Sequence, residues 1–124
     1  MTASDATSPE AAERRDAVPT VSVCMPVSRP PDVVRRALRN VLAQDLGDFE
    51  VVVGDETGTA EAVVAELGDP RISYHRNPRR LGFSANHCAL LDRARGRYLA
   101  IFHDDDEWEP GYLSSMSAVL EVST

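Results

Sequence analysis

The feature that most constrains this chain is a strand pattern followed by a helix pattern, which occurs four times in succession. Short runs rich in Val, Ile and aromatic residues predict strands at 20–25, 49–53, 71–75 and 98–102. Helices are predicted at 32–44, 59–67, 85–95 and 110–122. Such alternation implies parallel strands, because each crossover connection carries a helix. We therefore expect an α/β fold, a Rossmann-like open parallel sheet of about four strands flanked by helices.

The strand patterns differ in the burial that they predict. The 98–102 run has five apolar residues without a break, which is typical of a strand covered on both faces. The 71–75 run alternates and is expected nearer an edge. Ser84 is expected to cap the 85–95 helix, with Gly96 just past its end.

Composition narrows the class of protein. With 124 residues the chain can form one domain with a core, and residues 1–18 are expected to be a disordered tail before a domain over 19–124. A net charge of -7 argues against a nucleic-acid partner. No apolar run approaches the ~20 residues of a transmembrane segment, and no secretory signal is visible. Cys24 and Cys88 are expected to be buried free thiols, in line with a cytoplasmic protein.

A dense acidic run directly follows the fourth predicted strand. It consists of His103 and the three aspartates Asp104, Asp105 and Asp106. Two like charges ~5 Å apart repel by roughly 3 kcal/mol at an effective dielectric constant near 20. Such a run needs positive charge nearby, either a hard divalent cation or a cluster of arginines. A solvated acidic turn is the alternative, and we favour the ion site because a predicted buried strand leads directly into the run.

The predicted topology brings other loops to the same place. Parallel strands have their carboxyl ends at one edge of the sheet, so residues 26–29, 54–57, 76–80 and 103–106 should share a crevice. The loops after the second and fourth strands are acidic, and those after the first and third are basic. A metal bound by the aspartates beside arginines predicts a phosphate-bearing ligand. Asp55 could accept a hydrogen bond from a base or a ribose hydroxyl.

Several phosphate-binding classes are excluded by the loop after the first strand. Its sequence, Pro-Val-Ser-Arg, has neither the glycines and lysine of a P-loop nor the Gly-x-Gly-x-x-Gly of a dinucleotide site. A nucleotidyltransferase would also need a glycine-rich loop there. Phosphohydrolases of the haloacid dehalogenase type have their paired aspartates after the first strand, whereas here they follow the fourth. Without a glycine loop, a metal would have to bind most of a pyrophosphate.

An ordered set of segments resembles a known family. These segments are Val-Ser-Val-Cys-Met-Pro, Asp-Phe-Glu-Val-Val-Val-Gly-Asp-Glu, Arg-Asn-Pro-Arg-Arg-Leu-Gly-Phe-Ser-Ala-Asn and Phe-His-Asp-Asp-Asp-Glu-Trp-Glu-Pro. In this order they are similar to the nucleotide-sugar-binding half of the inverting family-two glycosyltransferases, which have the GT-A fold. The resemblance extends from about Val18 to Leu120.

The resemblance implies a nucleotide-diphosphate sugar donor, usually UDP-linked, and a divalent metal, Mn²⁺ or Mg²⁺. It assigns the metal to Asp105 within a motif like Asp-x-Asp. The nucleotide-binding residues that it implies are Pro26, Val27, Ser28, Asp55, Glu56, Arg80, His103 and Asp104. Two positions depart from the family pattern: His103 stands where an aspartate is common, and Gly54-Asp55-Glu56 replaces the commoner Val-Asp-Asp.

The resemblance also implies an acceptor-binding half and a catalytic base beyond Thr124, so the domain is expected to be truncated. The chain would then be the donor-binding part of a hexosyltransferase-like enzyme. The alternative is a non-catalytic nucleotide-binding module or remnant. A half-domain exposes a sheet edge and a helix face, so self-association is expected. We expect no functional partner for His75 or His87, and a packing role for Trp108.

Overall fold

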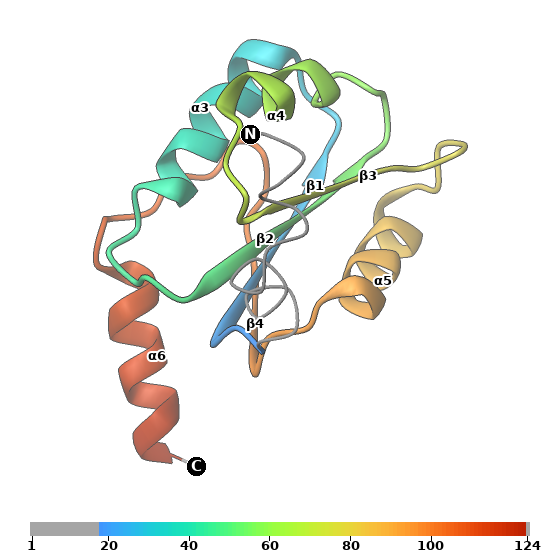
Figure 1. Cartoon of the computed structure of the whole chain (residues 1–124). Coiled ribbons are helices and arrows are strands. Elements are labelled where there is room, and N and C mark those ends of the chain that lie inside the picture. The colour runs from blue at the N-terminus through green and yellow to red at the C-terminus, as the bar shows by residue number, and fades with distance from the viewer. Residues whose placement is uncertain (1–17, 124) are drawn as a thin grey trace, which may run out of the picture.

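The computed structural model describes residues 18–123 and confirms the predicted α/β fold. The predicted tail, residues 1–18, lies outside the described residues apart from Val18. The strands are β1 (Val21–Val27), β2 (Phe49–Asp55), β3 (Ile72–Arg76) and β4 (Tyr98–Ile101), and the helices are α3 (Pro31–Leu42), α4 (Glu61–Leu67), α5 (Phe83–Arg93) and α6 (Tyr112–Ser123). Figure 1 shows the strands side by side, with α6 extending away from the sheet.

The four strands form one parallel sheet in the order β3-β2-β1-β4. In its register Val23 of β1 lies between Val51 of β2 and Ala100 of β4. The edge position predicted for β3 is confirmed. The prediction that the fourth strand is covered on both faces is wrong: β4 lies at the other edge, and Leu99 is 52% exposed. An apolar run shows that a strand is hydrophobic but not where it lies in the sheet. It therefore does not distinguish a central strand from an edge strand.

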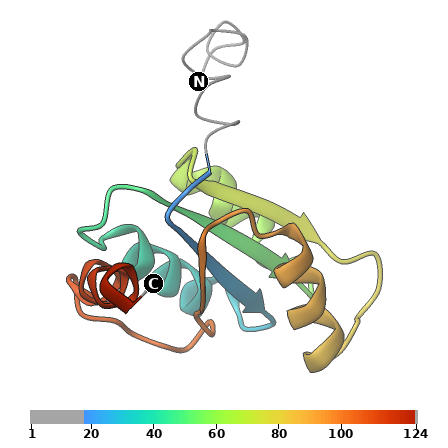
Figure 2. The same cartoon turned by 90° about the horizontal axis from the view of Figure 1, so that it is seen from below.

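Helices cover both faces of the sheet, and Figure 2 shows α5 on the side opposite α3. The larger core lies between one face and α3 and α4, and alternate residues of β1 and β2 point into it. The smaller core lies under α5 and contains Cys24, Val52 and Leu90. This alternation follows from the two-residue side-chain period of a strand.

The segment that follows the acidic run is tied to α3. The Asn40 side chain donates to the Trp108 carbonyl oxygen (3.1 Å) and accepts from the Trp108 backbone N–H (2.7 Å). Gln44 donates to the Glu109 carbonyl oxygen (2.7 Å). Trp108 packs edge-on against the buried Phe102 ring, with 4.6 Å between ring centroids, so its expected packing role is confirmed. These contacts fix where the acidic run leaves the sheet.

Three local expectations are corrected. Ser84 does not cap the helix predicted at 85–95, because α5 starts at Phe83, directly after Gly82 with φ 87°. Gly96 does not end this helix and lies against β1, where a Cβ atom would be 2.6 Å from the Ser22 nitrogen. Both cysteines are free, but only Cys24 is buried and Cys88 is exposed. Burial, followed by the charge of Glu50, raises the pKa of Cys24 to about 11. None of the helices within residues 18–123 has the length and apolar character needed to cross a membrane.

Candidate functional site

A pocket of about 310 Å³ opens at the carboxyl ends of the strands. The strand order reverses at β1, which has β2 on one side and β4 on the other, and this is where open α/β sheets bind ligands. Eight of the nine predicted site residues line the pocket: Pro26, Val27, Ser28, Glu56, Arg80, His103, Asp104 and Asp105. The ninth, Asp55, does not.

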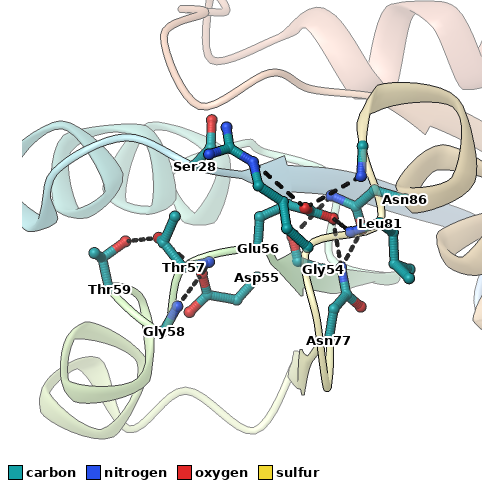
Figure 3. Close-up of polar contacts among 12 residues, drawn as sticks. Ser28, Gly54, Asp55, Glu56, Thr57, Gly58, Thr59, Asn77, Leu81 and Asn86 are labelled. Carbon is teal, nitrogen blue, oxygen red and sulfur yellow. Dashed lines mark hydrogen bonds and ion pairs between the residues drawn. The ribbon is translucent and has the colours of Figure 1, made fainter.

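Asp55 is fully buried at the end of β2 and holds the turn that follows it (Figure 3). Its Oδ1 accepts hydrogen bonds from the backbone N–H groups of Thr57 (3.1 Å) and Gly58 (2.9 Å). Its Oδ2 accepts from the Ala60 N–H (3.0 Å) and the Tyr74 hydroxyl (2.7 Å). Burial raises the pKa of Asp55, but these hydrogen bonds together bring it below its ordinary value. The predicted contact with a base would require Asp55 to give up one of these bonds.

Glu56 points to the other side of the strand end and holds the basic loop against the pocket (Figure 3). Its carboxylate accepts hydrogen bonds from the Asn77 side chain (2.9 Å) and from the backbone N–H groups of Leu81 (3.2 Å) and Gly82 (3.3 Å). Arg80 is 4.0 Å away in an ion pair, and only 6% of the Glu56 side chain is exposed. Glu56 therefore connects β2 to the loop that leads into α5.

Asp104 joins the loops that follow β1 and β4. Its Oδ2 accepts hydrogen bonds from the backbone N–H groups of Ser28 (2.8 Å) and Arg29 (2.9 Å). The loop after β2 is tied to the same segment, because the Thr59 hydroxyl donates to the Arg29 carbonyl oxygen (2.9 Å). The pocket wall at residues 28–29 is thus held from two sides by hydrogen bonds.

Asp105 is the most open carboxylate of the three predicted site acids that line the pocket. Its side chain is 52% exposed and accepts a hydrogen bond from Arg29 Nη2 at 3.0 Å. No cluster of three or more His, Cys, Asp or Glu side chains within residues 18–123 is arranged to hold a metal. A single open carboxylate still fits Mg²⁺ or Mn²⁺, because such hard cations commonly take their other ligands from substrate phosphates and water.

Two histidines meet on the opposite wall. His103 Nε2 lies 3.4 Å from His87 Nε2, and both residues line the pocket beside Phe83. His87 thus has a structural neighbour in His103, and the expectation that it has no functional role stays a prediction. His75 does not line the pocket, and its Nε2 lies 2.8 Å from the Ser73 hydroxyl oxygen.

Four lining residues at the start of α5 were not predicted: Gly82, Phe83, Asn86 and His87. Arg29 also lines the pocket, as expected from the loop ranges, although it was not named as a nucleotide-binding residue. The sequence did contain a signal for the four at α5, because the basic loop after β3 leads directly into this helix and ends at the same sheet edge. Only Arg80 of the two neighbouring loop arginines lines the pocket; Arg79 does not.

The fold and site define the chain as an α/β protein with a ligand pocket at the switch point of a parallel sheet, walled by carboxylates and arginines. The family described as glycosyl transferase family 2 matches residues 22–122, and the chain belongs to this family.

Similar proteins include enzymes named for different sugars. The putative colanic acid biosynthesis glycosyl transferase WcaA of Escherichia coli K12 is 34% identical over 77% of this chain and 36% of its own length. The GalNAc(5)-diNAcBac-PP-undecaprenol beta-1,3-glucosyltransferase of Campylobacter jejuni is 31% identical over 80% of this chain and 34% of its own. The mannosyltransferase PcManGT of Pyrobaculum calidifontis, solved with GDP-Man and Mn²⁺, matches 84% of this chain and 32% of its own, with a TM-score of 0.69 and 26% identity. The chain thus spans about a third of the length of these proteins.

Proposed function

We propose that residues 19–124 form the nucleotide-sugar-binding domain of a glycosyltransferase, with a UDP-linked sugar as donor and inversion at the anomeric carbon. The observation that carries this proposal is the pocket itself. It brings together residues from the ends of β1, β2 and β4 and from the basic loop, as a nucleotide diphosphate requires. Membership of glycosyl transferase family 2 supports sugar transfer, and the GDP-Man and Mn²⁺ bound to the mannosyltransferase support a nucleotide-sugar donor and a divalent metal. The choice of a UDP-linked donor and of inversion rests on the family resemblance.

Each wall of the pocket has a role in this proposal. Residues 26–28 line the base and ribose, Glu56 holds the basic loop in place beside them, and Arg80 and His103 lie near the diphosphate. Asp104 keeps the 28–29 segment in place through its two backbone hydrogen bonds. Arg29 is paired with Asp105 in this structure. A cation at Asp105 would compete with this ion pair, and the Arg29 charge could then face a phosphate. A Mn²⁺ or Mg²⁺ ion at Asp105 would neutralise charge on the leaving diphosphate.

The proposal is tested by calorimetric titration of UDP with and without MnCl₂. We expect Mn²⁺ to tighten UDP binding by at least about tenfold, or ~1.4 kcal/mol. Asp105→Ala should remove this metal dependence. Glu107→Ala is the matched control, because it removes the same charge from an exposed position of the acidic segment that does not line the pocket.

Two results would contradict the proposal. The first is that UDP does not bind in either condition. The second is that Asp105→Ala and Glu107→Ala reduce the effect of Mn²⁺ equally, because a general loss of acidic charge would then explain it. Titration of GDP under the same conditions tests the preference for uracil.

A further inference from the structure

We propose that Asn77 is a positioning residue, which keeps the Arg80 guanidinium available at the pocket wall for an oxyanion such as a diphosphate. Asn77 is only 3% exposed and does not line the pocket. Its side chain links Glu56, directly after β2, to Asn86 in the first turn of α5 (Figure 3). The inference rests on the proposed function in one respect, the placing of Arg80 near the phosphates.

The hydrogen bonds around Asn77 can run in only one direction. The Gly54 carbonyl oxygen can only accept, and Asn86 Nδ2 donates to it at 3.2 Å, so Asn86 Oδ1 faces Asn77. Asn77 Nδ2 then donates to Asn86 Oδ1 (3.0 Å) and to Glu56 Oε1 (2.9 Å). Turning the Asn77 amide around would set its oxygen against both of these oxygens. The network therefore fixes the orientation of both asparagine side chains.

This orientation has a cost in stability. Asn77 Oδ1 is buried and has no hydrogen-bond partner among residues 18–123. A buried acceptor without a partner is destabilising, whereas an apolar side chain of similar shape would avoid that penalty. The presence of the amide is therefore better explained by what its N–H groups hold than by stability alone.

The group that Asn77 holds on the pocket side is the Glu56 carboxylate. This carboxylate accepts hydrogen bonds from three neutral donors, the Asn77 side chain and the backbone N–H groups of Leu81 and Gly82. Arg80 Nε lies 4.0 Å from Glu56 Oε2, and the Arg80 side chain is 74% exposed. Because neutral donors already satisfy Glu56, the arginine keeps its guanidinium available to a ligand in the pocket.

Removing the Asn77 amide should change this balance. Glu56 would lose one donor, and water would replace it poorly because only 6% of the Glu56 side chain is exposed. Arg80 is the charged donor beside it, and a charge-assisted hydrogen bond is roughly twice as strong as a neutral one. We expect Arg80 to close on Glu56 in Asn77→Ala and to leave the pocket wall. Phosphate-bearing ligands should then bind more weakly, although Asn77 does not line the pocket.

The test is a double-mutant cycle of Asn77→Ala and Arg80→Ala, read by calorimetric titration of UDP and, separately, of inorganic pyrophosphate at a fixed MgCl₂ concentration. We expect each single variant to weaken the binding of both ligands by about tenfold. The double variant should bind no more weakly than Arg80→Ala, because Asn77 acts through that arginine. A merely structural role would give independent losses that multiply to about a hundredfold.

Two control variants match these changes. Ser22→Ala removes a neutral donor from another buried carboxylate, that of Glu50, at the opposite end of β1 and β2. It should change the affinity for both ligands by less than about twofold. Arg79→Ala removes a charge from an exposed position of the same loop that does not line the pocket. Its effect should stay below about threefold.

A second measurement uses the parent chain and does not depend on how the variants fold. Hydrogen exchange in the free protein should show the backbone amides of Leu81 and Gly82 protected relative to their intrinsic rates, because Glu56 accepts from both. Unprotected exchange at both amides would overturn the proposal. So would additive losses in the cycle, parent-like affinity of folded Asn77→Ala, or an equal loss in Ser22→Ala.

The two ligands separate this inference from the proposed function. Pyrophosphate binding with the expected coupling, but without UDP binding, would contradict the nucleotide-sugar donor and leave the role of Asn77 intact. UDP binding without the coupling would contradict only the role of Asn77. If the parent binds neither ligand, both proposals are overturned.

Discussion

At the scale of single residues, two adjacent acids have different tasks. Asp55 holds the turn at 57–60, and Glu56 holds the loop at 77–82. They diverge because successive side chains at a strand end point to opposite sides. The sequence predicts both as nucleotide-binding residues, but the structure places only Glu56 in the pocket wall. A motif of neighbouring acids therefore locates a site more reliably than it identifies which acid faces the ligand.

The Tyr74 hydroxyl should stabilise the ionised form of Asp55. We predict that Tyr74→Phe lowers the free energy of unfolding by about 1.5 kcal/mol at neutral pH, because a hydrogen bond to a buried charge is lost. The folded-state pKa of Asp55 is lowered, so this stabilisation is present above its unfolded pKa and is lost as the pH falls through the folded value. Urea unfolding at several pH values should show the difference between variant and parent shrinking below about pH 4.

Tyr112→Phe is the control for this prediction. Its hydroxyl makes no hydrogen bond among the described residues, and its side chain is 39% exposed. It should change the free energy of unfolding by less than about 0.5 kcal/mol at every pH. A Tyr74→Phe effect that stays constant from neutral to acidic pH would mean that the hydroxyl acts through packing and not through the charge of Asp55.

At the scale of elements, the contact between β2 and α5 depends on a glycine. A Cβ atom on Gly54 would lie 2.6 Å from Asn86 Oδ1 and 3.1 Å from Leu90 Cγ. Asn86 Nδ2 also donates to the Gly54 carbonyl oxygen at 3.2 Å. The close approach of strand and helix brings the start of α5, with its lining residues, to the pocket.

Gly54→Ala should therefore disturb both stability and the site. We predict a loss of about 1–3 kcal/mol in the free energy of unfolding, because overpacking forces α5 away from the sheet. Gly47→Ala is the matched control, since a Cβ atom there meets nothing within 4 Å. Denaturant unfolding of both variants measures the difference, and equal stabilities would show that α5 can move aside at no cost.

The element patterns were predicted with different success for a physical reason. The helix over 32–44 and the strand over 49–53 were confirmed to within a few residues. The spacing of their buried residues is visible within each segment, so it can be read without knowing the rest of the fold. The burial predicted for β4 was not confirmed: this strand lies at the sheet edge, and Leu99 is exposed. That place depends on the packing of the other three strands.

At the scale of the whole molecule, the exposed apolar surface of α6 is the feature that most favours self-association. Tyr112, Met116 and Val122 are 39%, 43% and 89% exposed. Figure 1 shows the helix extending beyond the sheet, with few neighbouring elements. Contiguous apolar surface of this kind favours association. This observation supports the expected self-association of the chain.

We predict that the isolated chain forms dimers or larger species whose proportion rises with concentration. Light scattering coupled to size-exclusion chromatography measures this directly. Met116→Lys should shift the equilibrium toward monomer, because a charge cannot be buried in an apolar contact without a partner. Leu91→Lys is the control, as Leu91 is 42% exposed but lies on α5. A monodisperse monomer at all concentrations would contradict the prediction.

Local pattern was enough to establish the alternation of strands and helices, and with it a parallel sheet and the loops that meet at its edge. The nine residues that the family resemblance implies fall in these loops, and eight of them were found in one pocket. Strand order, the direction of Asp55 and the meeting of His87 with His103 were decided only by the tertiary structure. These features join residues far apart in the chain, and their geometry is set by how the helices pack on the sheet. Periodicity is a property of short segments, so it does not predict how helices pack on the sheet or which distant residues meet.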